Sequence, residues 1–178
     1  MQMPTYDPSN AECLVYVYRE GLASAVGHDL EIEVTDFRIE VGGDGAVDAE
    51  FAADSLRVRH AVEDRQPRPG KLSAKDKKKI ERNIQKDVLE TKRFPVINFK
   101  STEVQRTDGR VRVDGVLSLH GVERNLGLDG RVDGDQTVAE VGFDQRDFDI
   151  APYKALLGAL KLKPRVDVVV RVPFVPSE

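Results

Sequence analysis

The alternation of apolar and polar residues in the second half of the chain is the feature that most constrains its fold. Over residues 162–174, valines, a leucine and a phenylalanine share one parity, and charged side chains such as Lys163 and Arg165 occupy the other. A period of two is typical of β-strands, because successive side chains point to opposite faces of a sheet. Short turns rich in Gly and Asp join these segments, which favours antiparallel pairing. We therefore predict an all-β fold that is mainly antiparallel.

Eight segments have the character of strands. The first has apolar residues on both parities, so we expect it to be covered on both faces. In the second, the apolar parity changes at Thr35-Asp36, which predicts a bulge or a sharp bend. Eight such strands predict a closed or nearly closed barrel, which can hold one small ligand, with a β-sandwich as the competing arrangement. The predicted strands are 12–20, 30–41, 46–59, 96–105, 110–120, 122–132, 136–144 and 162–174.

One segment departs from the period of two. Residues 73–90 contain no Gly or Pro and place Ile80, Ile84 and Val88 four positions apart, which predicts an amphipathic α-helix. Ser73 is the expected N-cap, with Asp76 in the place of the capping-box acid, and a proline at position 95 limits the other end. A shorter helix or turn is predicted around residues 153–159. We expect residues 1–178 to form a single domain.

Composition excludes several classes of protein. The chain of 178 residues has one cysteine, no tryptophan, 6% aromatic residues and a net charge of −4. A single cysteine rules out an internal disulfide and a multi-cysteine metal site, and we assign Cys13, which lies in an apolar strand, to the core. The sequence contains no apolar run of the length a membrane helix needs. Because it opens without a basic segment followed by an apolar one, we expect a cytoplasmic protein, with a removed leader as the alternative.

No catalytic motif is present in the sequence. His28, His60 and His120 lack the short spacing of metal ligands, so we predict neither a metal site nor a cofactor. His28 stands between Gly27 and Asp29 at the start of a strand. It could be a structural residue bonded to the backbone, a polar group that contacts a ligand at a barrel mouth, or a catalytic acid or base. No nucleophile is evident beside it, which weighs against the third reading.

The segment 71–93 is basic on an otherwise acidic chain. It has nine Lys and Arg against four Asp and Glu, giving about +5 while the rest of the chain has about −9. The plain interpretation is a solvated helix face. The alternative is docking on an anionic membrane surface or a phosphate head group. Binding to nucleic acid is disfavoured by the acidic net charge of the chain and its few aromatic residues. Assembly as a homodimer is left as an open alternative.

The strands predict an aliphatic inner face. That face either forms a packed core or, in a wider barrel, lines a dry lumen for an aliphatic chain, and periodicity does not decide between the two. The residues assigned to it are Val111, Val113, Leu117, Leu119, Leu126, Leu128, Val166, Val168 and Val170.

Two segments, in the order in which they occur along the chain, resemble the YceI-like family. Residues 93–101 (RFPVINFKS) are similar to its "yP.I.F.S" strand, and residues 113–124 (VDGVLSLHGVER) to its "v.G.Ltl.Gv.r" pattern. The helix stands just before the first segment, as in the family, and the resemblance extends over about residues 12–174. Residues 25–30 and 152–160 look like features of a cytoplasmic branch, whereas many family members are secreted.

The resemblance implies an extended, lipocalin-like antiparallel barrel that holds an isoprenoid or other acyl-type chain and has no catalytic residues. We therefore predict non-catalytic binding or carriage of a lipophilic chain by burial of its aliphatic surface. His28, Tyr153 and Lys154 are the expected contacts for its polar head. The alternatives are an enzyme that acts on a small lipophilic substrate with His28 as acid or base, and an interaction protein with a filled core.

Overall fold

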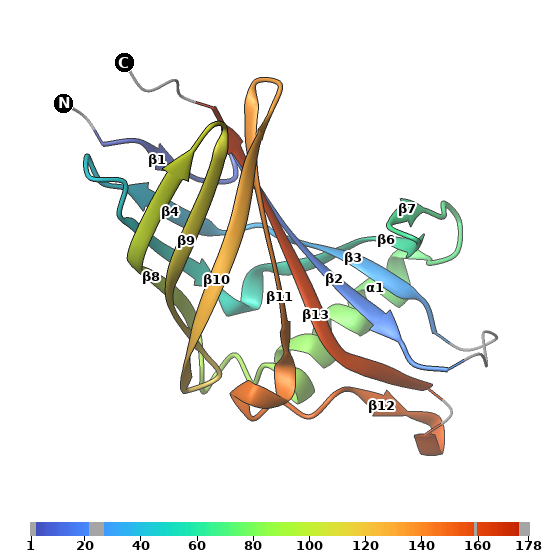
Figure 1. Ribbon diagram of the computed structural model, residues 1–178. Coiled ribbons are helices and arrows are strands. Elements are labelled where there is room, and N and C mark those ends of the chain that lie inside the picture. The colour runs from blue at the N-terminus through green and yellow to red at the C-terminus, as the bar shows by residue number, and fades with distance from the viewer. Residues whose placement is uncertain (1–2, 22–26, 159, 175–178) are drawn as a thin grey trace.

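The computed structural model describes residues 3–21, 27–158 and 160–174. Within these residues, thirteen strand segments form one antiparallel sheet that curls into a half-barrel (Figure 1). The order along the sheet is β1-β4-β5-β8-β9-β10-β11-β13-β2-β3-β6-β7, with β12 paired to β13. The segments are β1 (Thr5–Tyr6), β2 (Glu12–Arg19), β3 (Asp29–Val34), β4 (Phe37–Val41), β5 (Val47–Ala52), β6 (Leu56–Glu63), β7 (Gln66–Pro67), β8 (Val96–Thr107), β9 (Arg110–Leu119), β10 (Val122–Asp133), β11 (Gln136–Asp144), β12 (Lys154–Ala155) and β13 (Leu160–Pro173).

Two long strands are bent, and each is divided into two of the segments given above. This explains why the segments outnumber the eight predicted strands. β3 continues into β4 through Thr35-Asp36, where the sequence predicts the bend, and β5 continues into β6 through a 3₁₀ turn, η1 (Ala53–Ser55). The two corners lie side by side, because the Thr35 amide donates to the Ser55 carbonyl at 3.0 Å. The change of parity therefore keeps Val34 and Phe37 in the same core cluster. Apart from the two-residue segments β1, β7 and β12, the described sheet thus consists of eight long strands.

The predicted helix is confirmed, together with its cap. α1 (Ala74–Asn83) continues into a π-helical turn, η2 (Ile84–Val88). The Ser73 hydroxyl accepts a hydrogen bond from the Asp76 amide at 3.0 Å, and the Asp76 carboxylate accepts one from the Ser73 amide at 3.0 Å. The segment packs Ile80, Ile84 and Val88 against the core of the sheet. Its apolar stripe is therefore covered, and charged side chains are left on the outer side.

Both faces of the sheet carry apolar residues where β2 passes. Cys13, Val15 and Val17 join the main cluster on the inner face, which draws on the long strands and the helix. Leu14 and Tyr16 point the other way into a smaller cluster on the outer face. The prediction that this strand is covered on both sides is confirmed.

The shorter predicted helix is only a 3₁₀ turn. In the segment 153–159, β12 comes first and is followed by η4 (Leu156–Gly158), while residue 159 lies outside the described residues. A further 3₁₀ turn, η3 (Gln145–Phe148), follows β11.

Candidate functional site

The two ends of the half-barrel differ in structure. At one end β2 stops at Arg19, β3 starts at Asp29 and β13 starts at Leu160, and α1 lies beside them (Figure 1). We call this the α1 end. The other end, which we call the turn end, carries β1, the end of β13 and the tight turns at 42–45, 107–109 and 133–135 (Figure 1).

The residues predicted to line the lumen lie on the inner face. Leu117 and Leu119 are buried in the main cluster, and Val113, Leu126, Leu128, Val168 and Val170 pack against it while only partly buried. Val111 and Val166 are not members of that cluster. Their strand partners, Gly130 and Val17, place them on the same face, where Val166 is buried and Val111 is partly exposed. These nine positions therefore give the inner face aliphatic side chains, and part of their apolar surface remains accessible to solvent.

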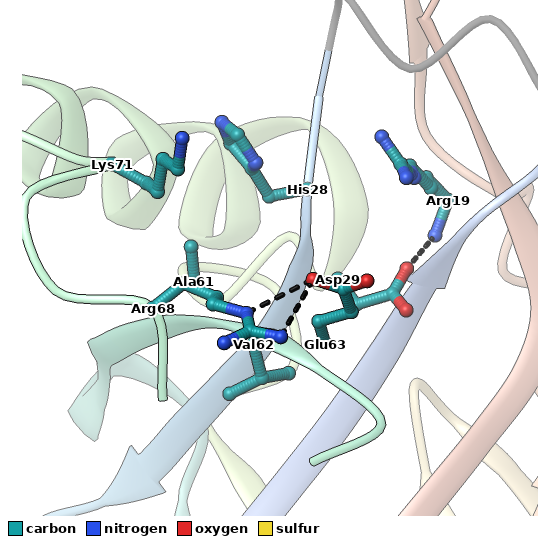
Figure 2. A pocket seen from close by; sticks show the side chains of 8 residues that line it. All are labelled: Arg19, His28, Asp29, Ala61, Val62, Glu63, Arg68 and Lys71. Atoms are coloured by element: carbon teal, nitrogen blue, oxygen red, sulfur yellow. Dashed lines mark hydrogen bonds and ion pairs between the residues drawn. The ribbon is translucent and has the colours of Figure 1, made fainter. Parts of the chain in front are cut away.

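A hollow of about 370 Å³ lies at the α1 end (Figure 2). Three cationic side chains, Arg19, Arg68 and Lys71, line it together with His28. Two carboxylates, Asp29 and Glu63, partly offset this positive charge. Ala61 and Val62 complete its lining.

Both carboxylates in the hollow are engaged in bonds. Asp29 accepts a hydrogen bond from the Arg19 amide at 2.8 Å, which ties the end of β2 to the start of β3. Glu63 pairs with the Arg68 guanidinium at 2.9 Å (Figure 2). The hollow therefore has an excess of positive charge and suits an anionic or strongly polar group.

The three residues predicted to contact a ligand head lie at the α1 end but do not share one hollow. His28 lines the hollow described above. Lys154 lines a second one of about 310 Å³ with Ala155, Leu157 and Gly158. The Tyr153 hydroxyl accepts a hydrogen bond from the Asn83 side-chain amide at 3.0 Å, so it ties the β12 segment to α1.

Sequence reasoning missed Arg19 and Arg68 as residues of this site and treated Lys71 only as part of a basic segment. Arg19 comes close to His28 because β2 pairs with β3, and Arg68 joins them through the β6–β7 hairpin. These juxtapositions depend on sheet register, so no local pattern in the sequence could have revealed them.

Similarity to known proteins identifies the family of this chain. A YceI-like domain model matches residues 22–174. The chain belongs to the YceI-like family. None of the curated proteins matches this YceI-like chain.

Solved structures share the fold of this YceI-like chain at low sequence identity. Burkholderia cenocepacia BcnA has a TM-score of 0.65 at 12% identity, with 95% of this chain and 99% of that chain covered. A polyisoprenoid binding domain from Saccharophagus degradans, implicated in plant cell wall breakdown, has a TM-score of 0.58 at 11% identity, covering 96% and 97%. The Campylobacter jejuni YceI protein has a TM-score of 0.58 at 12% identity, covering 88% and 92%.

The remaining candidates for chemistry in this YceI-like chain have structural partners. Burial raises the pKa of the Cys13 thiol to about 12, which keeps it unreactive at neutral pH. His120 holds the β9–β10 turn in place: its Nδ1 lies 3.1 Å from the Phe148 carbonyl, and its Nε2 lies 2.8 Å from a Glu90 carboxylate oxygen. His60 stands opposite Glu31 in the β3–β6 ladder. Within the described ranges, no group of three or more His, Cys, Asp or Glu residues could hold a metal ion.

No helix in the described part of the chain is both long enough and apolar enough to cross a membrane.

A network of tyrosines and charged residues covers the outer cluster. The Tyr16 hydroxyl donates to Glu31 at 2.8 Å, and burial together with this bond raises the pKa of Tyr16 to about 12. Arg65 stacks on the Tyr16 ring, with its guanidinium carbon 4.6 Å from the ring centre. Tyr18 donates to Asp167 at 2.6 Å. These interactions satisfy the polar groups on a covered face, so we assign the network to stability.

Asp167 gives this network a testable pH dependence. Burial opposes its charge, but hydrogen bonds from Tyr18 and Arg165 outweigh burial and hold the pKa of Asp167 below its ordinary value of 3.8. A lowered carboxyl pKa stabilises the fold above the unfolded-state pKa, and this contribution is lost as the pH falls through the folded-state pKa. We expect Asp167→Asn to lower the free energy of unfolding at pH 7 by about 2 kcal/mol. The difference from wild type should shrink below about pH 4 in urea titrations.

The matched control for that substitution is Asp129→Asn. Asp129 pairs with Arg112 at 3.0 Å, but its side chain is 79% exposed. Exposed ion pairs contribute little, so this variant should lose less than about 1 kcal/mol at every pH. Equal losses in free energy of unfolding in the two variants would show that the network around Asp167 contributes no more than an exposed ion pair does.

Proposed function

We propose that this YceI-like chain, as a single domain over residues 1–178, binds and carries a lipophilic chain of the isoprenoid or fatty-acyl type on the inner face of the half-barrel. The observation that carries the proposal is the inner face itself. Its partly exposed aliphatic residues come from β2, β9, β10 and β13, among them Val15, Val113, Leu126 and Val168. Burying an alkyl chain against such a face gains roughly 0.8 kcal/mol for each CH₂ removed from water.

Two further observations support a lipid as the ligand. A structural neighbour over almost the whole chain is a polyisoprenoid binding domain. The fold also leaves aliphatic surface accessible, as at Leu126 and Val168, where a protein with a filled core would have buried it.

The polar head of the ligand is assigned to the α1 end. His28 lies in the hollow with Arg19 and Lys71, while Lys154 lies in the second hollow. An anionic head would meet a net positive charge in the first hollow. Tyr153 contributes by holding the β12 segment against the helix through its bond to Asn83.

Non-catalytic binding fits this site better than an enzyme does. The residues that line the His28 hollow are basic, acidic or aliphatic, and they include no serine, threonine or cysteine nucleophile. Within the described residues, we find no nucleophile paired with His28 in the way that covalent catalysis requires.

The basic segment 71–93 gives the carrier a surface for an anionic membrane. Its apolar residues pack inward, whereas Lys75, Lys78, Lys79, Arg82 and Lys86 are exposed. Each lysine or arginine near an anionic surface contributes about 1 kcal/mol to binding. Location in the cytoplasm and assembly as a homodimer stay predictions of the sequence.

Native mass spectrometry tests the carrier proposal directly. Purified protein is analysed as isolated and after incubation with palmitate, hexadecanamide or a polyprenol. We expect a saturable one-to-one adduct with at least one of these probes, preserved in the presence of salt. A clean apo mass with no saturable uptake of any probe would overturn the proposal and favour a protein with a filled core.

A further inference from the structure

Leu157 is an apolar side chain that the fold presents to solvent. It is fully exposed, at 109% relative accessibility, whereas Val96, Phe174 and Met3, the other large exposed apolar residues described, lie between 38% and 55%. Its backbone is in the left-handed region, with φ of 55° and ψ of 32°. A non-glycine residue in that region costs about 1 kcal/mol or more. The chain therefore accepts backbone strain at the position where it holds a leucine out into water.

Three exposed lysines lie on the two strands that flank this leucine. Lys154 lines the same hollow as Leu157. Lys161 is the strand partner of Lys154 across the β12–β13 pairing, and Lys163 follows on β13, exposed like the other two. Lys161 lies 3.4 Å from Glu20, the only carboxylate paired with these three lysines in the described residues. The β12–β13 loop, by which we mean the described residues 154–158 and 160–163, thus combines an exposed leucine with three exposed lysines.

The loop stands at the α1 end, beside the polar residues of the first hollow. The Glu20 amide donates to the Lys161 carbonyl at 2.7 Å, and Arg19 pairs with Leu162. In Figure 1 the β12 segment and α1 both lie at this end of the half-barrel, away from β1. The Asn83–Tyr153 bond joins the helix to the residue that precedes β12.

We propose that the β12–β13 loop inserts Leu157 into the surface of a bilayer that contains anionic lipids, with Lys154, Lys161 and Lys163 contacting the lipid head groups. Charge complementarity selects this partner, because an apolar side chain flanked by exposed lysines matches an interface that is apolar below and anionic above. The proposal deepens the proposed function and rests on it, because it identifies where a carried chain enters and leaves. Insertion at this end allows the lipid to pass between membrane and protein without crossing bulk water.

The absence of tryptophan from the sequence provides a direct test. Leu157→Trp introduces the only indole, so its fluorescence reports on the loop alone. The full chain is mixed with vesicles of phosphatidylcholine, with or without phosphatidylglycerol. We expect a blue shift, and quenching by lipids with brominated acyl chains, with the mixed vesicles only. Met3→Trp is the matched control, because Met3 is also exposed but precedes Pro4, whose carbonyl accepts from the Val41 amide beside the turn at 42–45, and its emission should not shift.

Two unlabelled variants test the proposal in vesicle co-sedimentation. Leu157→Ser should weaken binding to the mixed vesicles roughly tenfold, and Lys161→Glu with Lys163→Glu by about fivefold or more for each lysine. Both should retain a lipid probe in native mass spectrometry as wild type does, because neither changes the inner face. Equal vesicle binding by Leu157→Ser and wild type would overturn the insertion.

The remaining outcomes separate this proposal from the carrier function. A probe retained on the inner face without any indole shift would overturn insertion and leave the carrier intact. An indole shift without probe uptake would support insertion while refuting the carrier. A shift that grows with protein concentration in the absence of vesicles would overturn insertion in favour of contact with a second copy of the chain.

Discussion

Replacing Phe148 with alanine should lower the free energy of unfolding by about 3–5 kcal/mol, the range typical of a large aromatic removed from a core. Phe148 is 0% exposed and packs edge-on against Phe143, with 5.3 Å between the ring centres. The buried ring also anchors the backbone of Phe148, whose carbonyl oxygen lies 3.1 Å from His120 Nδ1. The cavity left by the ring would therefore open beside η3 and the β9–β10 turn. The end of the helical segment lies close by, because Glu90 contacts His120 in that turn.

The measurement is urea unfolding followed by circular dichroism, with Phe174→Ala as the matched control. Phe174 is 38% exposed, so its loss should change the free energy by no more than about 0.5 kcal/mol. If Phe148→Ala costs less than about 1 kcal/mol, the contact between η3 and the β9–β10 turn does not belong to the cooperative core.

The strands and the helix were predictable because their signals are local. Alternation places each side chain on one face, and the capping residues Ser73 and Asp76 mark a helix start without reference to the rest of the chain. The second corner of the sheet was missed. Its residues, 53–55, contain neither Gly nor Pro, and the turn forms because the neighbouring strand bends beside it at Thr35-Asp36. That corner is imposed by pairing with a neighbour, which no local window of the sequence contains.

In the candidate site, too, the features with a local sequence signal were predictable and those that depend on strand pairing were not. The apolar face follows from strand parity, and Leu126 and Val168 both pack against its main cluster, while their contact with a ligand stays a prediction. The grouping of Arg19, Arg68 and His28 in one hollow was not predictable, because these residues converge through the register of separate hairpins. Leu157 shows a further limit. Its sequence context is that of an ordinary apolar residue, and its exposure follows from a left-handed backbone that composition does not reveal.

The strongest functional effect is expected from a charge placed on the inner face. Leu126 is half-buried on β10 and packs against the main cluster, while Asn125, the preceding residue, is exposed on the other side of the strand. Leu126→Glu would set a carboxylate against the bound alkyl chain, and desolvating that carboxylate opposes binding. We expect the dissociation constant for a fluorescent fatty-acid probe to rise roughly a hundredfold, the equivalent of about 2.7 kcal/mol. Asn125→Glu adds the same charge one residue away and should leave the affinity unchanged.

A second substitution keeps this test valid if Leu126→Glu does not fold. Val168→Phe adds apolar bulk to the half-buried part of the inner face without adding charge, so the fold should tolerate it at a cost of about 1–3 kcal/mol. The added ring should occupy space that the ligand uses, so long chains should bind more weakly while short ones keep their affinity. If Leu126→Glu and Val168→Phe both bind the probe as Asn125→Glu does, the ligand does not lie on the inner face. The partly exposed aliphatic residues there would then be an imperfectly packed core, and any lipid that co-purifies would have to be held at the α1 end alone.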